Sequence, residues 1–178
     1  MTSLSSLSRP CMLVAAVFAG LTLCAGSSAS AQAPIPYGEP ISLDGEPISL
    51  EQAKKVIAAA EAEARKNNWP VAIAVVDGSG FLVAFQRLDN TQLGSVEVAL
   101  EKAKTSALFR RPTKVFEEML VAGGAGLKVL KLPGALPIEG GLPIVKDGKI
   151  IGAIGVSGVK STEDAQVATA GLEVFQAQ

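Results

Sequence analysis

The loop residues Glu139, Gly140 and Gly141 have types and spacing that suit chemistry on a small anionic ligand. Two adjacent glycines let backbone amides approach a ligand closely and form a concavity for an anion. A carboxylate beside them can act as a general base if it is partly desolvated, which makes Glu139 the catalytic candidate. The alternative is a loop that leads into a strand and needs glycines only for its turn angles.

Cationic and hydroxyl side chains elsewhere in the chain would help to hold such an anion. The planar guanidinium of Arg87 suits a carboxylate, and a surface or intersubunit salt bridge would explain this residue equally well. Lys102 and Thr105 lie three residues apart on one face of an expected helix, where solvated lysines are the alternative. Ser157 precedes an expected helix N-terminus, whose amides either bind an anion or only lead into the helix.

Histidine is absent from the sequence, and the two cysteines, Cys11 and Cys24, both lie near the N-terminus. The missing histidine excludes a Ser-His-Asp triad, a histidine general base and the commonest ligand of zinc and haem. If the N-terminal segment is removed, no thiolate nucleophile, disulfide or cysteine metal ligand is left. We therefore expect no metal site, and chemistry that depends on carboxylates, cations, hydroxyls and backbone groups.

Residues 1–31 have the three parts of a secretory signal peptide. Arg9 supplies the only charge, and Ala29-Ser30-Ala31 offers the small-x-small pattern that signal peptidase cleaves. The apolar run between them, about fourteen residues long, is too short to span a bilayer comfortably, which disfavours a membrane anchor. We expect cleavage after Ala31 and a mature protein in the periplasm or outside the cell.

Cleavage at that position would leave 147 of the 178 residues, a usual size for one domain. It would remove one of the 16 basic side chains and none of the 17 acidic ones, so the net charge would be −2. This charge balance argues against a nucleic-acid partner. No basic amphipathic stretch indicates a membrane surface once the signal peptide is gone.

A tandem duplication marks the start of the mature chain, where GEPISLD at 38–44 is followed by GEPISLE at 45–51. In the second copy, Ser49 and Gln52 complete a capping box for a helix from about Leu50 to Lys66. The first copy has no such role. We therefore expect residues 32–47 to form an extended lead-in and residues 48–178 to form a single domain.

Hairpins and helices alternate along the rest of the chain. The patterns predict strands and helices by periodicity, and Asp147-Gly148 is the strongest short signal for a hairpin turn. We expect strands over 71–76, 81–88, 127–132, 142–146 and 149–156, and further helices over 94–109, 114–121 and 162–175, the last one capped by Ser161. This order predicts an α+β domain with a mostly antiparallel five-stranded sheet and helices on one face.

Five sequence blocks, in this order and spacing, resemble the GlcG/HbpS family of haem-binding and haem-degrading-type domains. The resemblance covers about residues 48–178 and implies a profilin-like fold, homo-oligomers such as octamers, and association with haem, a corrinoid or another small ligand. One block begins with Glu139, Gly140 and Gly141, which favours the functional interpretation of that loop, and another contains Lys102 and Thr105. The blocks are SLEQA at 49–53, VVDGSG at 75–80 with Arg87, EKAKTSA at 101–107, EGGLPI at 139–144 and IGAIGVSG at 151–158.

The resemblance indicates an exported, oligomeric protein that binds haem or a related tetrapyrrole. Because histidine is absent, the iron would need Tyr37, Met119, a lysine, a hydroxyl or water as its ligand. Arg87, Lys102 or Arg110 would pair with the haem propionates through charge-assisted hydrogen bonds.

An alternative function is a cofactor-free lyase or isomerase that acts on a small oxygenated carboxylic acid. Glu139 would abstract the proton, Arg87 or Lys102 would grip the carboxylate, and glycine amides would hold the enolate. A scaffold protein without a small ligand is a third interpretation. The residues alone leave open whether the protein is an enzyme.

Overall fold

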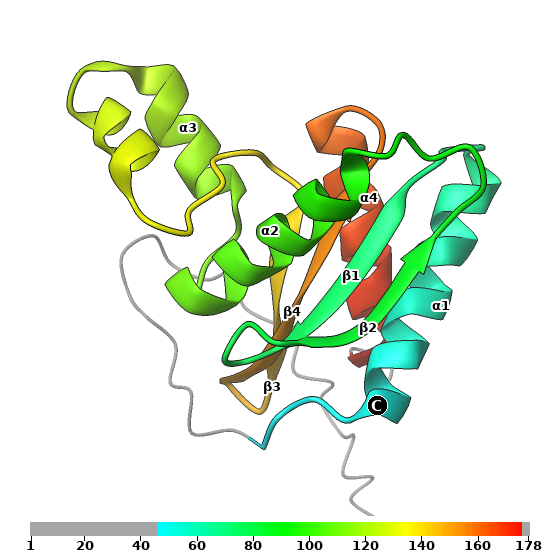
Figure 1. The fold of residues 1–178 in the computed structure, drawn as a ribbon. Helices are drawn as coiled ribbons and strands as arrows, with labels where there is room; N and C mark the ends of the chain where they lie inside the picture. The colour runs from blue at the N-terminus through cyan, green and yellow to red at the C-terminus, as the bar shows by residue number, and fades with distance from the viewer. Residues whose placement is uncertain (1–45, 176–178) are drawn as a thin grey trace, which may run out of the picture.

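The structure, a computed structural model, describes residues 46–175 (Figure 1). The predicted signal peptide, its cleavage site and the first copy of the duplication lie outside the described residues. The elements in chain order are α1 Leu50–Lys66, β1 Ala72–Asp77, β2 Leu82–Arg87, α2 Ser95–Phe109, α3 Lys114–Ala122, the 3₁₀ helix η1 Gly124–Lys131, β3 Gly141–Lys146, β4 Lys149–Ser157, α4 Ser161–Leu172 and the 3₁₀ helix η2 Glu173–Phe175.

The sheet is antiparallel throughout, with the strand order β2-β1-β4-β3. The α+β class and the antiparallel sheet are therefore confirmed, but the sheet has four strands and not five. The predicted strand over 127–132 is wrong, because most of this segment belongs to η1. Gly123 and Gly124, with φ of 67° and 54°, turn the chain directly after α3, so that η1 packs against α3 and joins no strand.

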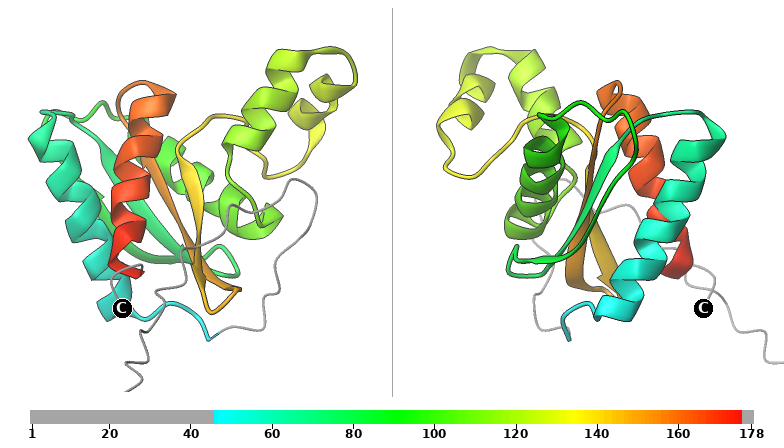
Figure 2. Two further views of the ribbon diagram at one scale, coloured as in Figure 1. Left: turned by 180° about the vertical axis from the view of Figure 1, so that it is seen from behind. Right: turned by 45° about the vertical axis from the view of Figure 1, so that its right-hand side comes forward.

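Helices cover both faces of the sheet, which corrects the expectation of a single covered face (Figure 2). Helix α2 lies on one face, and α1 and α4 lie on the other. The cause is that β1 and β4 are apolar at successive residues and so bury both faces. Alanines such as Ala72, Ala74 and Ala153 face α2, while Ile73 and Val75 face the opposite layer.

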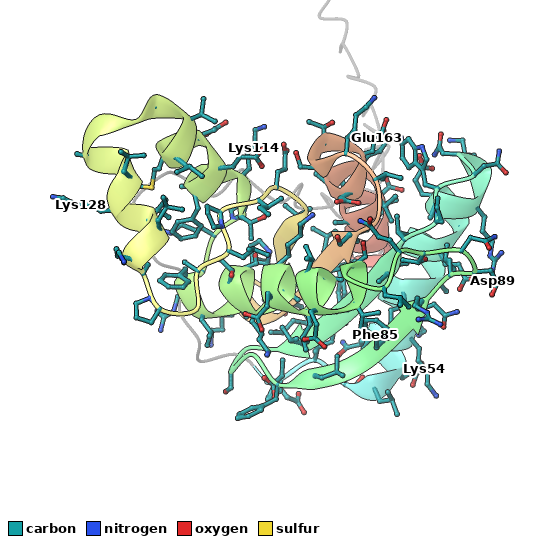
Figure 3. The ribbon with its side chains drawn as sticks, turned by 45° about the horizontal axis from the view of Figure 1, so that its top comes forward. Lys54, Phe85, Asp89, Lys114, Lys128 and Glu163 are labelled. Carbon is teal, nitrogen blue, oxygen red and sulfur yellow. The ribbon has the colours of Figure 1, made fainter. Side chains whose placement is uncertain are left out.

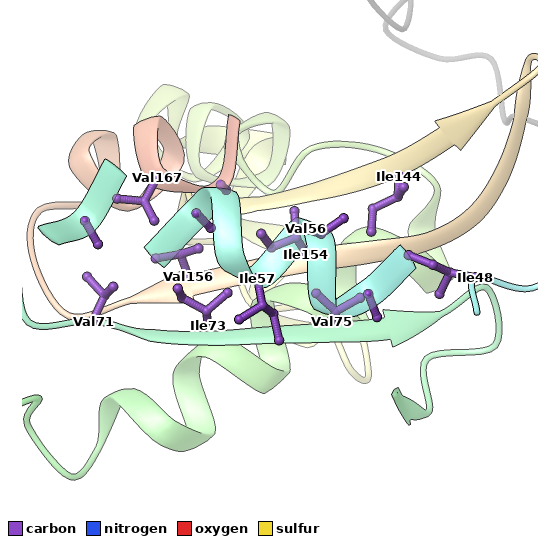
Figure 4. Packing of buried hydrophobic residues seen from close by; sticks show 14 of the residues in the cluster. Ile48, Val56, Ile57, Val71, Ile73, Val75, Ile144, Ile154, Val156 and Val167 are labelled. Atoms are coloured by element: carbon purple, nitrogen blue, oxygen red, sulfur yellow. The ribbon is translucent and has the colours of Figure 1, made fainter. Parts of the chain in front are cut away.

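The larger part of the core lies between the sheet and the layer of α1 and α4 (Figure 4). The second copy of the duplication anchors this layer. Ile48 is buried in it and donates its backbone N–H to the Ile151 carbonyl at 2.8 Å. The predicted capping box is confirmed, since the Gln52 amide donates to the Ser49 hydroxyl and the Ser49 amide donates to Gln52 Oε1.

Helix α2 approaches β4 more closely than a side chain at residue 155 would permit. A Cβ atom on Gly155 would overlap the backbone carbonyl of Ala99. Burial of Ala99, Ala103 and Ala107 on the facing side of α2 completes this tight contact. Glycine and alanine at these positions therefore set the spacing between α2 and the sheet.

Residues 114–131, which comprise α3 and η1, form an arm that projects from the layered body (Figure 2). Several of its large apolar side chains are exposed, among them Val121 at 81% and Leu130 at 59%. Within residues 46–175, no helix combines the length and the apolar character that crossing a membrane requires.

Helix α4 begins at Ser161, one residue earlier than predicted, and ends at Leu172. Lys160 occupies the N-cap position. The predicted cap is wrong because the Ser161 hydroxyl instead donates to Glu117 Oε1 at 3.3 Å, which ties α4 to the arm.

Candidate ligand-binding site

Glu139 lies in the loop before β3 and forms an ion pair with the first residue of α3. Lys114 Nζ donates to both carboxylate oxygens of Glu139 at 3.2 Å. The Glu139 side chain is only 14% exposed, whereas that of Lys114 is 51% exposed. The hydrogen bond from Lys114 to Glu139 raises the pKa of Lys114, with further help from the charges of Glu118 and Glu117.

Glu117 connects this loop to α4. Its Oε2 accepts the backbone N–H of Glu139, and its Oε1 accepts the hydroxyl of Ser161. Lys114, on the same helix as Glu117, lies on the side of the arm toward α4 (Figure 3). The start of α3, the Glu139 loop and the start of α4 therefore meet in one polar cluster.

Gly140 and Gly141 lie directly against helix α2. Gly140 has a φ of 123°, and a Cβ atom there would lie 2.8 Å from Lys102 Nζ and 2.9 Å from Asp164 Cβ. The Gly141 amide donates to the Thr113 hydroxyl at 2.9 Å, so this donor already has a partner within the protein. These contacts give both glycines a packing role, and their role in ligand binding stays a prediction.

Lys102 is buried, with 1% of its side chain exposed, and is not the solvated lysine that the sequence offered as an alternative. Its Nζ donates to Asp164 Oδ2 at 2.7 Å and to the Val156 carbonyl at 2.9 Å. Burial raises the pKa of Asp164, while the nearby Lys102 opposes that effect. In this arrangement the charge of Lys102 is paired inside the protein.

The hydroxyls of Thr105 and Ser157 also have partners within the protein. Thr105 Oγ1 donates to the Gly134 carbonyl at 3.1 Å and accepts the Leu136 amide at 2.9 Å, which holds the loop after the arm. Ser157 Oγ donates to Ser95 Oγ at 3.3 Å.

The amides that follow Ser157 point to a carboxylate of the protein itself. The amides of Gly158 and Val159 donate to Asp164, so the anion bound at the start of α4 is the protein's own side chain.

Arg87 lies far from the Glu139 loop. It is exposed at the end of β2, opposite Ala72 of β1, which in turn pairs with Ser157 of β4. Because β2 and β3 are opposite edges of the sheet, three strand spacings of about 4.8 Å separate the strand of Arg87 from the strand of Gly141. The structure therefore brings Glu139, Gly140, Gly141 and Lys102 together, and leaves Arg87 at the other edge.

Sequence reasoning missed three charged residues of this region, Lys114, Glu117 and Asp164. A lysine at the first position of a helix is unfavourable for the helix dipole, so Lys114 carried a signal for an acidic partner outside α3. Asp164 carried no such signal, because an acidic residue in the first turn of α4 is what a helix normally favours.

The described residues hold no group of three or more histidine, cysteine, aspartate or glutamate side chains arranged for a metal ion. A haem requires apolar contacts for its faces and cations for its propionates. The arm offers exposed leucine and valine side chains together with the exposed Lys128 and Lys131. Half-buried Met119 on α3 is the sulfur ligand available there. These residues fit a porphyrin better than the surroundings of Lys102 do.

A hollow of about 620 Å³ lies elsewhere, between the N-terminus of α1 and the β3–β4 hairpin. Its walls include Ser49, Gln52 and Asp147, and none of its lining residues belongs to the predicted site.

Comparisons with known proteins agree on one family. Residues 48–173 match the family described as HbpS-like haem-degrading protein. Protein GlcG of Escherichia coli strain K12 is 46% identical over 110 residues, which are 62% of this chain and 81% of GlcG. A double mutant of HbpS from Streptomyces reticuli is similar in structure, with a TM-score of 0.68 and 30% identity over 82% of this chain and 98% of that chain.

A crystal structure of PduOC in complex with haem also shares the fold. Its TM-score is 0.65, over 71% of this chain and 94% of that chain. The sequence identity is 24%, so this likeness establishes the fold alone.

Proposed function

We propose, since this chain belongs to the HbpS-like family of haem-degrading proteins, that it binds haem or a related tetrapyrrole. The observation that carries the proposal is the arm, whose exposed Val121, Leu127 and Leu130 lie in one segment with the exposed Lys128 and Lys131. A porphyrin has apolar faces and two carboxylates, which this combination of side chains matches. When bound, haem would supply a redox-active iron, and the protein would supply contacts to the faces and the propionates.

Titration of the purified protein with hemin tests this proposal. We expect a saturable shift of the Soret band at stoichiometric hemin. Replacement of two arm residues, Leu127→Ser with Leu130→Ser, should weaken binding by about tenfold or more, because it removes apolar contact area. The matched control is Leu93→Ser, which changes a leucine that is 78% exposed on the loop before α2. A protein that shows no saturable shift, or an arm variant that binds as the control does, would contradict the proposal.

Export and self-association complete the proposed function. The signal peptide pattern supports export, and the exposed apolar arm supports a homo-oligomer, for which we propose an octamer. Native mass spectrometry of the protein recovered from the periplasm or medium tests both points. We expect a chain that begins at Gln32 and assemblies of eight copies. Protein found only in the cytoplasm would contradict export, a retained N-terminus would contradict cleavage after Ala31, and a monomer would contradict self-association.

The geometry supports the lyase or isomerase alternative less well. Both oxygens of Glu139 accept hydrogen bonds from Lys114, so a general base would first have to leave an ion pair. Of the two cations expected to grip the substrate, Arg87 lies at the opposite edge of the sheet and Lys102 is paired with Asp164. A catalytic role for Glu139 stays a prediction.

A further inference from the structure

We infer that the buried ion pair Lys102–Asp164 has a positioning role: it holds the backbone of the Glu139–Gly141 loop in the position that ligand binding requires. This inference rests on the proposed function, because the loop is bonded to Lys114 and Glu117 at the base of the arm, where we propose that the tetrapyrrole binds. It also changes the role expected for Lys102, from a residue that touches the ligand to one that acts through the loop.

The pair differs from the other ion pairs among residues 46–175. Its side chains are 1% and 3% exposed, whereas each of the other pairs has at least one side chain that is 35% or more exposed. Replacing a buried ion pair by apolar residues is often neutral or even stabilising. Stability alone is therefore a weak reason for a pair at this position, and its other contacts indicate what it does.

Those contacts join the two helical layers at the point where β3 begins. Lys102 extends from α2 on one face of the sheet, and Asp164 belongs to α4 on the other face. The ammonium group also binds the Val156 carbonyl at the end of β4. The Asp164 carboxylate accepts the amides of Gly158 and Val159.

The same pair determines where Gly140 lies. The Val156 amide donates to the Gly140 carbonyl at 2.9 Å, and the Val156 carbonyl accepts from Lys102 Nζ. The backbone of Val156 therefore connects the ion pair to Gly140. Gly140 lies so close to Lys102 Nζ that a single added carbon would be 2.8 Å from it. Glu139 is the direct neighbour of Gly140 in the chain. Its amide donates to the Glu117 carboxylate, and its own carboxylate accepts from Lys114. A displacement of the ammonium group would therefore be transmitted to Glu139 and to the base of the arm.

A double replacement separates positioning from stability. Lys102→Met with Asp164→Leu removes both charges and keeps the volume apolar, and we expect it to unfold cooperatively in urea as the unchanged protein does. If positioning is the role, hemin affinity should still fall by about tenfold, the factor that corresponds to one charged hydrogen bond. Hydrogen exchange of the Val156 amide should also become faster, because its acceptor Gly140 is no longer held.

The matched control is Lys55→Met with Glu51→Leu, which removes an exposed ion pair of α1. It should change neither hemin affinity nor exchange at Val156. If the double replacement at 102 and 164 does not fold, Lys102→Gln with Asp164→Asn provides the same comparison, since it removes both charges and keeps an oxygen for the Val159 amide.

Hemin affinity equal to that of the unchanged protein would overturn the inference, whether or not exchange is faster. Weaker hemin binding with unchanged exchange at Val156 would overturn it too, because the effect would not pass through the loop. If the unchanged protein fails to bind hemin, the proposed function fails. The hydrogen-exchange rate of the Val156 amide in the double variant then still shows whether the ion pair holds the backbone of the loop in place.

Discussion

Gly140 combines two constraints in a single residue. Its φ of 123° is unfavourable for any residue with a side chain, and a Cβ atom would meet Lys102 Nζ and Asp164 Cβ. The structure shows that this glycine makes room for a buried ammonium group, a constraint that is separate from the ligand-binding role predicted from the sequence. The two constraints can be separated experimentally, because Gly148 shares only the first of them.

We predict that Gly140→Ala destabilises the protein by about 2–5 kcal/mol, the sum of backbone strain and overpacking. Gly148→Ala is the control, since Gly148 has a φ of 73° and no atom within 4 Å of an added Cβ. It should cost about 1–2 kcal/mol from strain alone. Urea unfolding of both variants measures the difference, and an equal loss in the two would show that the contact with Lys102 does not constrain residue 140.

The titration of Asp164 gives a second prediction at this scale. Its pKa is raised by burial above the ordinary 3.8, although Lys102 opposes the shift. The folded protein therefore holds this proton more tightly than the unfolded chain does. The resulting stabilisation is present below the ordinary pKa and is lost as the pH rises through the raised value.

We expect the free energy of unfolding to fall relative to that of Asp164→Asn as the pH rises above about 4, by at most about 1.4 kcal/mol per pH unit. Urea unfolding of both proteins at a series of pH values measures this difference. Subtracting the free energies of unfolding of the two proteins cancels the contributions of the other carboxylates. One of these is Glu63, whose lowered pKa changes the stability in the opposite direction. A gain in stability relative to the asparagine variant over this range would contradict the prediction.

At the scale of secondary structure, the duplicated segment shows how context decides the role of a sequence. Both copies contain Pro-Ile-Ser-Leu, but only the second is followed by residues that continue as a helix. Its Ser49 caps α1, and its Ile48 enters the core beside β4. After the first copy, Gly45 and Pro47 would interrupt a helix.

Replacement of the two equivalent serines tests this difference. Ser49→Ala should lower the free energy of unfolding by about 1 kcal/mol, because it removes the oxygen that accepts the Gln52 amide. Ser42→Ala, the matched change in the first copy, should have no measurable effect. Thermal or urea unfolding of both variants provides the measurement, and a comparable loss from Ser42→Ala would mean that the first copy also has a structural role.

At the scale of the whole molecule, two helical layers enclose the sheet, and the Lys102–Asp164 pair joins them. Tight packing of α2 depends on glycine and alanine, whereas the opposite layer depends on isoleucine and valine. The arm lies outside both layers and leaves apolar side chains exposed. The body therefore provides a closely packed base, and the arm provides the surface that we propose for the tetrapyrrole.

Several features of this protein were determined by its sequence alone. Local rules were sufficient for the capping box of α1, the Asp147-Gly148 hairpin and the approximate limits of α2, because these depend on neighbouring residues. The five sequence blocks were sufficient for the family, which the comparisons confirm. The absence of histidine limited the available chemistry by composition alone, since it removes one side chain type from every possible site.

Only the tertiary structure decided how the charged residues around Gly140 are partnered. Lys102 and Asp164 are 62 residues apart, and Lys114 and Glu139 are 25 apart, so neither pair leaves a periodic pattern in the sequence. The predicted fifth strand was wrong because a tertiary contact decided its conformation. Segment 127–132 packs on α3 and pairs with no strand. The sequence drew attention to the EGG block at 139–141 for ligand binding, which stays a prediction. The packing role of Gly140 could be recognised only in the tertiary structure, where the ammonium group of Lys102 lies directly against it.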